Sequence, residues 1–347
     1  MNLDGKHVLV TGGTGSLGQA VVERLLGGTL GRPSRVTVLS RDEAKQHDMR
    51  LGLVGRPLAG DEAFRDAGQQ LRFRIGDVRD LATMCDAVRD AQVVIHVAAL
   101  KQVPTCEYHP LEAVQTNVLG ADVLARAVRT AGHEVEVVVG ISTDKACKPV
   151  NVMGMTKAIM ERVLVEANLS CPRTRFVVVR YGNVLGSRGS VIPLFLDQIA
   201  RGGPVTVTMK EMTRFVLTLR QAADAVFDAL AGARPGEIYV PQAPSARIVD
   251  LALALMGAAE VPLVFTGLRP GEKIHEIMVS EEECHRTVAR GSYYAICPML
   301  PECDPQRPAG SVLTREYSSA DVTLDRASLR ALLALPAVAG PAGSERS

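Results

Sequence analysis

Short runs of Val, Ile and Leu alternate with helix-like stretches over the first 180 residues, and this alternation narrows the fold more than any other feature. The runs have the length of strands, and the stretches between them place apolar residues at helical spacing. Strands that alternate with crossover helices form a parallel sheet covered on both faces. The pattern therefore predicts a doubly wound α/β sheet. The expected strands are 7–10, 35–40, 72–77, 93–98, 135–142 and 175–181, and the expected helices include 17–26, 109–130 and 153–167.

The pattern changes after Tyr181, where loops become longer and strand-like runs shorter. We expect one domain over residues 1–180 and a smaller lobe over 181–334 whose elements interleave with it. Residues 51–70 are weakly patterned and are expected to form a surface excursion. The segment 335–347 is rich in Pro, Gly, Ser and Ala, which predicts a disordered tail.

Composition and charge exclude several classes of protein. Lys+Arg 39 against Asp+Glu 38 gives a net charge of +1, which argues against a nucleic-acid partner. No apolar run is long enough to span a membrane, and no signal peptide is expected. The seven cysteines are scattered, and no histidine pair has the spacing of metal ligands, so we expect reduced thiols, a cytoplasmic location and no metal.

The sequence VLVTGGTGSLG at residues 8–18 joins the first expected strand to the first expected helix. Glycines at such a turn let the backbone approach a pyrophosphate at a helix N-terminus, where free N–H groups favour anions. The segment therefore predicts a dinucleotide site and a sheet of Rossmann type. The expected cofactor contacts are Gly12, Thr14, Gly15, Ser16, Leu17 and Gly18, with Val78 and Ala98 after the third and fourth strands.

The end of the second strand predicts which dinucleotide binds. An acidic residue there is typical of NAD sites, whereas Arg or Lys suits the 2′-phosphate of NADP. Here Ser40 and Arg41 end the strand and Lys45 follows one turn later, so NADP is expected. Asp42 comes one position too late for the usual ribose contact. Asp77 could accept from the adenine amine, or it could cap a helix.

The fifth strand is followed by Thr143, and the next helix carries Met153 and Lys157. This arrangement resembles short-chain dehydrogenase/reductases, in which a Ser or Thr faces a Tyr-x-x-x-Lys motif. Lys157 and Thr143 match, but Met153 stands at the Tyr position, and a thioether cannot take a proton. The residues alone leave two interpretations: a pseudoenzyme, or an enzyme with its acid and base elsewhere.

Longer segments resemble the UDP-N-acetylglucosamine 4,6-dehydratases, extended short-chain dehydrogenase/reductases of capsule and glycan biosynthesis. The resemblance spans residues 7–333, and capsule-type members also carry Met at the position of Met153. It therefore implies a subfamily feature rather than an inactive protein. The segments that carry it are 98–121, 142–161, 180–207, 211–219, 268–276 and 315–325.

The resemblance implies a reaction and a role for each residue. Hydride leaves C4 of the sugar for NADP⁺, a base removes the C5 proton, an acid assists loss of the C6 hydroxyl, and hydride returns to C6. By resemblance Lys145 is the base and Asp144 the acid, Lys157 binds the nicotinamide ribose, and Thr143 binds the C4 hydroxyl. We expect burial to keep a proton on Asp144 and nearby positive charge to lower the pKa of Lys145. A relay through Thr143 and Asp144 is our hypothesis for the C4 proton.

The resemblance also implies a UDP-sugar site. Asn183 is expected beside the diphosphate, Ser190 and Val191 beside the uracil, and Glu272 beside the ribose. Arg214 and Arg269 are expected to clamp the diphosphate. Lys101 and Glu107 are expected to face the hexose, whereas Asn117 is expected to fix the active-site loop.

Two alternatives stay open beside the dehydratase, which is a lyase. A UDP-sugar 4-epimerase shares the fold and the oxidation at C4, but the ordinary epimerase relies on the Tyr. A non-catalytic NADP-binding regulator accounts for Met153 but not for Asp144 and Lys145. For the dehydratase, the capsule-type resemblance favours inversion at C5 over retention. It also implies a homo-oligomer.

Overall fold

The computed structural model describes residues 1–54, 70–186, 190–305 and 310–334. The predicted disordered tail at 335–347 lies outside these residues, as does most of the predicted surface excursion at 51–70.

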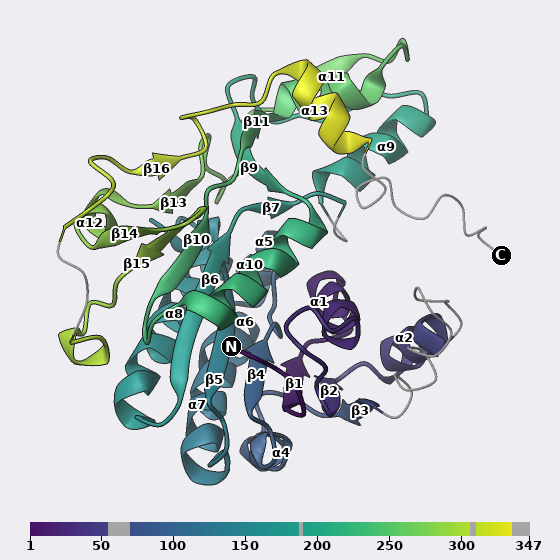
Figure 1. The fold of residues 1–347 in the computed structure, drawn as a ribbon. Coiled ribbons are helices and arrows are strands. Elements are labelled where there is room, and N and C mark those ends of the chain that lie inside the picture. The colour runs from purple at the N-terminus through teal and green to yellow at the C-terminus, as the bar shows by residue number, and fades with distance from the viewer. Residues whose placement is uncertain (55–69, 187–189, 306–309, 335–347) are drawn as a thin grey trace.

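A nine-stranded sheet forms the centre of the molecule (Figure 1). Its order is β14-β15-β10-β6-β5-β4-β1-β2-β3, and the seven strands from β10 to β3 are parallel. Strand β15 is antiparallel to β10, and β14 is antiparallel to β15. The predicted doubly wound Rossmann-type sheet is therefore confirmed. The strands are β1 (His7–Thr11), β2 (Arg35–Ser40), β3 (Leu71–Ile75), β4 (Val93–His96), β5 (Val137–Thr143), β6 (Arg175–Tyr181), β10 (Ile238–Pro241), β14 (Thr287–Arg290) and β15 (Tyr293–Ile296).

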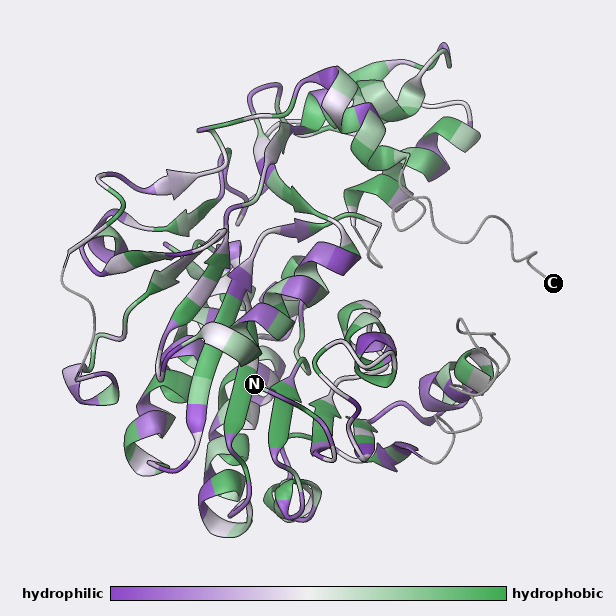
Figure 2. Cartoon of the chain, in the orientation of Figure 1, coloured by the Kyte–Doolittle hydropathy of each residue, from purple (hydrophilic) through white to green (hydrophobic). Residues whose placement is uncertain are grey.

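Helices cover both faces of this sheet, and the alternation of side chains along each strand supplies both cores. In β1, Val8 and Val10 pack into one apolar cluster, and Leu9 packs into the other. Figure 2 accordingly shows the central strands as largely hydrophobic. Helices α1 (Ser16–Leu26), α2 (Glu43–Val54) and α10 (Leu219–Gly232) contribute to the first cluster, and α4 (Leu81–Val88), α7 (Gly120–Ala131) and α8 (Val152–Ser170) to the second.

The helix predicted at 109–130 is not one regular helix. It consists of α6 (Pro110–Ala113), the π-helical turn η1 (Val114–Leu119) and α7, and α5 (Val103–Tyr108) precedes it. The amide of Asn117, inside the π-helical turn, bonds both main-chain groups of Leu100 and donates to Thr156 Oγ1 at 3.0 Å. These contacts explain the irregular turn, because they hold Asn117 against a distant loop, as the sequence predicted.

A smaller lobe with its own apolar core follows β6. The chain then returns to the central sheet through α10, β10, β14 and β15, so elements after residue 180 serve both parts. The lobe's small sheets are β7 (Asn183–Val184) with β9 (Thr213–Leu217) and β11 (Ser245–Arg247), β8 (Val205–Val207) with β12 (Leu263–Phe265), and β13 (Ile277–Val279) with β16 (Tyr317–Ser318). Its core helices are α9 (Val191–Ala200), α11 (Ile248–Met256) and α13 (Arg326–Leu333). The short helices α12 (Glu281–Cys284) and η3 (Pro301–Cys303) pack against the central domain instead.

A buried ion network joins β6, α8 and α12. The Arg180 guanidinium lies 2.6 Å from Glu161 and 2.7 Å from Glu283, and all three side chains are buried. Arg180 also donates to the carbonyl oxygen of Met278 at 2.8 Å. Arg286 contacts Glu283 as well, at 3.6 Å, but Arg180 is the cation that both carboxylates share.

We expect Arg180→Met to destabilise the protein by about 3–5 kcal/mol, because two buried carboxylates lose their shared partner. Urea unfolding would measure the change. The control is Arg201→Met, which removes an exposed ion pair to Asp197 and should change stability by less than about 1 kcal/mol. Equal unfolding midpoints for the two variants would contradict this account of the network.

Candidate active site

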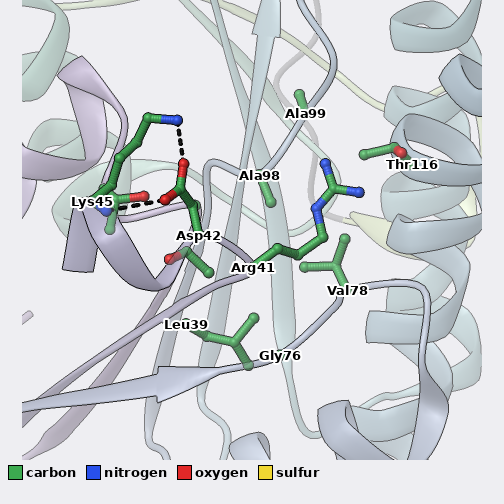
Figure 3. Close-up of a pocket in the computed structure, with 12 residues that line it drawn as sticks. Leu39, Arg41, Asp42, Lys45, Gly76, Val78, Ala98, Ala99 and Thr116 are labelled. Atoms are coloured by element: carbon green, nitrogen blue, oxygen red, sulfur yellow. Dashed lines mark hydrogen bonds and ion pairs between the residues drawn. The ribbon is translucent and has the colours of Figure 1, made fainter. Parts of the chain in front are cut away.

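A cavity of about 380 Å³ lies beyond the carboxyl ends of β1, β2 and β4 (Figure 3). Between β1 and β4 the strand order of the sheet reverses, which is where open α/β sheets bind ligands. Of the predicted cofactor contacts, Gly12, Thr14, Ser40, Arg41, Lys45, Val78 and Ala98 line the cavity. Leu39, Asp42, Gly76, Ala99 and Thr116 complete the lining.

The glycines of the first turn let its backbone pack closely against neighbouring backbone. Gly12 has φ 67°, and a Cβ there would lie 2.6 Å from the main-chain nitrogen of Ala98. A Cβ at Gly18 would lie 2.5 Å from Gly13 Cα, so this glycine lets α1 approach the turn. The N-cap of α1 is Gly15, so no capping side chain bonds to the N–H groups of the first turn of the helix. This cradle fits a dinucleotide pyrophosphate.

The remaining two predicted contacts in this segment, Ser16 and Leu17, belong to α1. Ser16 begins α1, and Leu17 is buried in the core beneath it.

Among the residues that the sequence did not indicate, Thr116 lines the cavity from the π-helical turn, and its buried hydroxyl has no hydrogen-bond partner among the described residues. An irregular helical turn leaves little trace in the periodicity of a sequence, so no signal indicated Thr116.

The side chains at the end of β2 divide into two groups in Figure 3. Arg41 extends across the cavity toward Thr116, whereas Lys45 points to Asp42 and pairs with it. Arg41 lies 3.7 Å from Asp77. Burial alone raises the pKa of Asp77, but hydrogen bonds from Arg79 and the charge of Arg41 bring it below its ordinary value. Asp77 therefore forms ion pairs with both arginines. It does not cap a helix, because the N-cap of α4 is Asp80.

Lys157 lies beside β5 and His96. Its Nζ donates to the carbonyl oxygen of Ile141 at 2.7 Å, and burial lowers its pKa to about 8. His96, which the sequence did not indicate, ends β4 with Nδ1 2.8 Å from Thr11 Oγ1. Burial and the charge of Lys157 lower the pKa of His96 to about 3, and its Nε2 has no hydrogen-bond partner in the described part of the chain.

The residues after β5, which form the short helical turn η2 (Asp144–Ala146), bring the predicted acid and base into contact. Asp144 is fully buried, and its Oδ1 accepts from Thr143 Oγ1 at 2.9 Å and from Lys145 Nζ at 3.0 Å. Within the described ranges its Oδ2 has no hydrogen-bond partner. A Cβ at Gly182 would lie 2.4 Å from Phe215 Cβ and 3.2 Å from this Oδ2, so a glycine after β6 lets β9 and this loop pack closely.

The expected lowering of the Lys145 pKa is wrong. Burial does act in that direction, but the carboxylates of Asp144 and Glu276 outweigh it and raise the pKa. Glu276 Oε1 lies 3.5 Å from Lys145 Nζ. The expectation considered only positive neighbours. It took the adjacent Asp144 as protonated, and the sequence does not indicate that Glu276 lies next to this lysine.

Met153 packs as an ordinary apolar side chain. It is buried in a small cluster with Cys106 and Ala113, at the start of α8. The main-chain nitrogen of Val152 donates to Glu107 at 2.7 Å, so Glu107 binds the first turn of α8, whereas the sequence suggested the hexose.

Three residues predicted to bind the sugar nucleotide carry buried polar atoms without hydrogen-bond partners among residues 1–54, 70–186, 190–305 and 310–334. Buried polar groups are normally bonded, so these atoms are available to a ligand. They are Asn183 Oδ1, Ser190 Oγ and Glu272 Oε2. Val191 begins α9 next to Ser190, and Lys101 and Arg269 are exposed.

Arg214 differs from the expectation of a clamp extended toward a ligand. It is buried, and it donates to the carbonyl oxygens of Thr213 at 2.7 Å and Ile274 at 3.1 Å. Its Nε lies 3.7 Å from Glu276. Its guanidinium is thus already partly engaged by the protein.

No helix among the described residues is both long and apolar enough to cross a membrane. In the same part of the chain, no cluster of three or more His, Cys, Asp or Glu side chains could hold a metal ion.

A glycine turn at the switch point of a doubly wound sheet, with Lys157 on the helix that follows β5, defines a protein of the short-chain dehydrogenase/reductase type. Within that class the chain belongs to the polysaccharide biosynthesis protein family, whose model matches residues 8–298. It is 42% identical over 296 residues to a UDP-glucose 4-epimerase of Rickettsia bellii (strain OSU 85-389), covering 84% of this chain and 82% of the relative.

Solved structures agree with this assignment. Pen from Bacillus thuringiensis is 33% identical with a TM-score of 0.83, covering 96% of this chain and 99% of that one. UDP-glucose 4-epimerase from Thermus thermophilus, in complex with NAD, is 25% identical with a TM-score of 0.62, covering 77% and 88%. The dTDP-glucose 4,6-dehydratase DesIV from Streptomyces venezuelae, at 23% identity and a TM-score of 0.65 over 77% and 86%, shares the fold. The chain is an enzyme of the nucleotide-sugar epimerase and dehydratase class.

We expect Gly12→Ala to weaken dinucleotide binding roughly ten- to a hundredfold, because a side chain at positive φ costs about 1–3 kcal/mol and meets the backbone of Ala98. Fluorescence titration would measure the affinity. The control is Gly52→Ala on the exposed face of α2, where a Cβ meets nothing within 4 Å. Unchanged affinity in a folded Gly12→Ala variant would contradict the assignment of this turn to the cofactor.

Proposed function

We propose that the protein is an NADP-dependent UDP-N-acetylglucosamine 4,6-dehydratase, a lyase that forms a UDP-2-acetamido-2,6-dideoxy-4-hexulose. One observation carries the proposal: a buried Asp144 in contact with Lys145 stands at the end of β5, while the position of the usual Tyr holds a buried Met153. Acid and base groups outside the Tyr position suit elimination across C5 and C6, which plain epimerisation at C4 does not need.

The proposed cofactor is NADP. The glycine turn and α1 would hold its pyrophosphate, and Lys157 would bind the nicotinamide ribose. Ser40 and Arg41 would bind the 2′-phosphate, since Arg41 extends into the cavity and β2 ends without an acidic residue. When bound, NADP would supply the acceptor for hydride from C4 of the sugar and the donor of hydride to C6. Solved relatives contain NAD, so Arg41 is the residue that distinguishes this proposal.

The loop after β5 would carry the proton transfers. Oxidation at C4 gives a ketone that acidifies the C5 proton, and Lys145 Nζ removes that proton. Asp144 would donate a proton to the C6 hydroxyl, which leaves as water, and a C5–C6 double bond would form. When hydride returns to C6, Lys145 would give a proton back to C5. Thr143 would bind the C4 hydroxyl and pass its proton to Asp144, which accepts from Thr143 Oγ1 at 2.9 Å. This relay would replace the missing Tyr.

The proposed UDP-sugar site lies between the sheet and the lobe. Asn183 follows β6 and lies in β7, which pairs with β9, the strand that carries Arg214. Asn183 and the exposed Arg269 would bind the diphosphate, with Ser190 at the uracil and Glu272 at the ribose. The unpartnered buried oxygens of Asn183, Ser190 and Glu272, judged over the described residues, support these assignments. A homo-oligomer and a cytoplasmic location remain part of the proposal.

A UDP-sugar 4-epimerase is the second candidate, because the Rickettsia relative has that name. The two reactions share oxidation at C4 and differ in what happens next. An epimerase would have to return hydride to C4 from the other face and leave Asp144 and Lys145 without a role at C5 and C6.

We expect Arg41→Met to weaken NADP binding roughly ten- to a hundredfold, since each lost charged hydrogen bond costs about 1.5–3 kcal/mol. NAD affinity should stay within about twofold, because NAD lacks the phosphate that Arg41 would bind. Isothermal titration with each dinucleotide would measure both. Arg50→Met is the control, since Arg50 lies over the Phe73 ring and does not line the cavity. An equal loss for both dinucleotides would contradict NADP selectivity.

Proton NMR of UDP-N-acetylglucosamine with enzyme and NADP⁺ in D₂O tests the reaction. We expect a 6-deoxy methyl signal with deuterium at C5, and the ring couplings then give the C5 configuration. Lys145→Met and Thr143→Val should abolish or strongly reduce the signal. Lys148→Met should keep it, because Lys148 pairs with Glu316 at the surface. Conversion to the galacto sugar without a methyl signal would establish the epimerase, and full dehydration by Thr143→Val would overturn the relay.

A further inference from the structure

Glu276 is a buried carboxylate that contacts Lys145, in the loop after β5. It ends the 268–276 segment, directly before β13, and its side chain is 3% exposed. Its Oε1 lies 3.5 Å from Lys145 Nζ and 3.7 Å from Arg214 Nε. Lys273 Nζ lies 3.7 Å from Oε2, which has no hydrogen-bond partner among the described residues. One carboxylate thus contacts three cations.

The backbone holds this carboxylate in place. The main-chain nitrogen of Glu276 donates to Ser319 Oγ at 2.9 Å, and its carbonyl oxygen accepts from the Ser319 nitrogen at 2.8 Å. Lys273 is tied separately, because its Nζ donates to the carbonyl oxygen of Cys147 at 2.6 Å. Glu276 therefore reaches Lys145 from a fixed point of the lobe, while Asp144 reaches it from the sheet.

Two carboxylate contacts fix the amino group of Lys145 better than one. Lys145 Nζ lies 3.0 Å from Asp144 Oδ1, its sequence neighbour, and a single such contact leaves a long side chain free to rotate about it. The second contact, to Glu276, removes that freedom. A base that must reach one ring proton needs this restriction.

We propose that Glu276 is a positioning residue that holds Lys145 Nζ between itself and Asp144 and balances the charge of Arg214 beside it. The proposal rests on the proposed function in one respect: Lys145 is taken as the group that removes the C5 proton. Glu276 itself acts through Lys145 and is given no proton transfer.

The charge of Glu276 has a consequence for pH dependence. The charged groups that face Lys145 are Asp144, Glu276 and Arg214. The two carboxylates raise the pKa of Lys145, so removing one lowers it. The neutral amine, which is the base, would then form at lower pH. The acid limb of the kcat profile should shift toward lower pH in Glu276→Gln, whereas a purely structural defect would scale the profile without shifting it.

The experiment titrates Lys145 directly in the protein with bound dinucleotide. Proteins labelled with ¹³C-lysine are followed by NMR across pH, and the Lys145 signal is identified by its loss in Lys145→Arg. We expect its midpoint to move to lower pH in Glu276→Gln and kcat to fall roughly ten- to a hundredfold at the wild-type optimum. Glu281→Gln, which removes a surface contact to Lys148, should leave the midpoint and kcat unchanged.

Glu276→Asp separates charge from position and serves where Glu276→Gln fails to fold. It keeps the carboxylate but withdraws it, so kcat should fall while the Lys145 midpoint stays above that of an exposed lysine. Full kcat in Glu276→Asp, or an unmoved Lys145 midpoint in a folded Glu276→Gln, would overturn the proposal. The NMR titration needs no turnover. A wild-type protein that does not dehydrate the sugar therefore counts against the proposed function and not against this contact.

Discussion

The contacts of Arg180 with Glu161 and Glu283 are the interaction on which the active-site architecture depends. They join a central strand, the helix that carries Lys157, and a short helix of the C-terminal segment. Ser142 Oγ donates to the same Glu161 at 2.6 Å, directly before Thr143. A buried network of this kind is costly to desolvate, and its value lies in fixing one arrangement of the groups it joins. Here that arrangement is the start of the loop after β5.

The other end of that loop is tied to the lobe. The carbonyl oxygen of Cys147 accepts from Lys273 Nζ, and the Cys147 thiol lies 3.7 Å from Glu283. Residues 142–147 are therefore anchored at both ends, one to the sheet and one to the segment that contains Glu276. The proposed chemistry at C5 and C6 needs an acid and a base at fixed separation, and this double anchoring would supply it before substrate binds.

The sequence predicted the features that depend on residues close together in the chain and missed those that depend on contacts between distant residues. Periodicity placed β2 and β6 within their observed bounds, and the glycine turn was predicted because its geometry depends on neighbouring residues. The π-helical turn was missed because a distant contact, Asn117 with Leu100, determines it. The engaged Arg214 was missed for the same reason, since Glu276 and the carbonyl oxygen of Ile274 reach it from far along the chain. The raised pKa of Lys145 was missed only partly for that reason, because the adjacent Asp144, which was expected to be protonated, raises it more than Glu276 does.

Met153 shows how one fold can host different reactions. The position lies on the helix that also carries Lys157, yet the Met side chain is buried among Cys106 and Ala113. The proposed dinucleotide cradle beside a UDP-sugar site would suffice for oxidation at C4 in either an epimerase or a dehydratase. The outcome then depends on the groups that face C5 and C6 after oxidation. In the proposed reaction those groups are Asp144 and Lys145, which the anchored loop holds in place. The relay through Thr143 to Asp144 would accept the C4 proton, so this reaction would need no residue at the Tyr position.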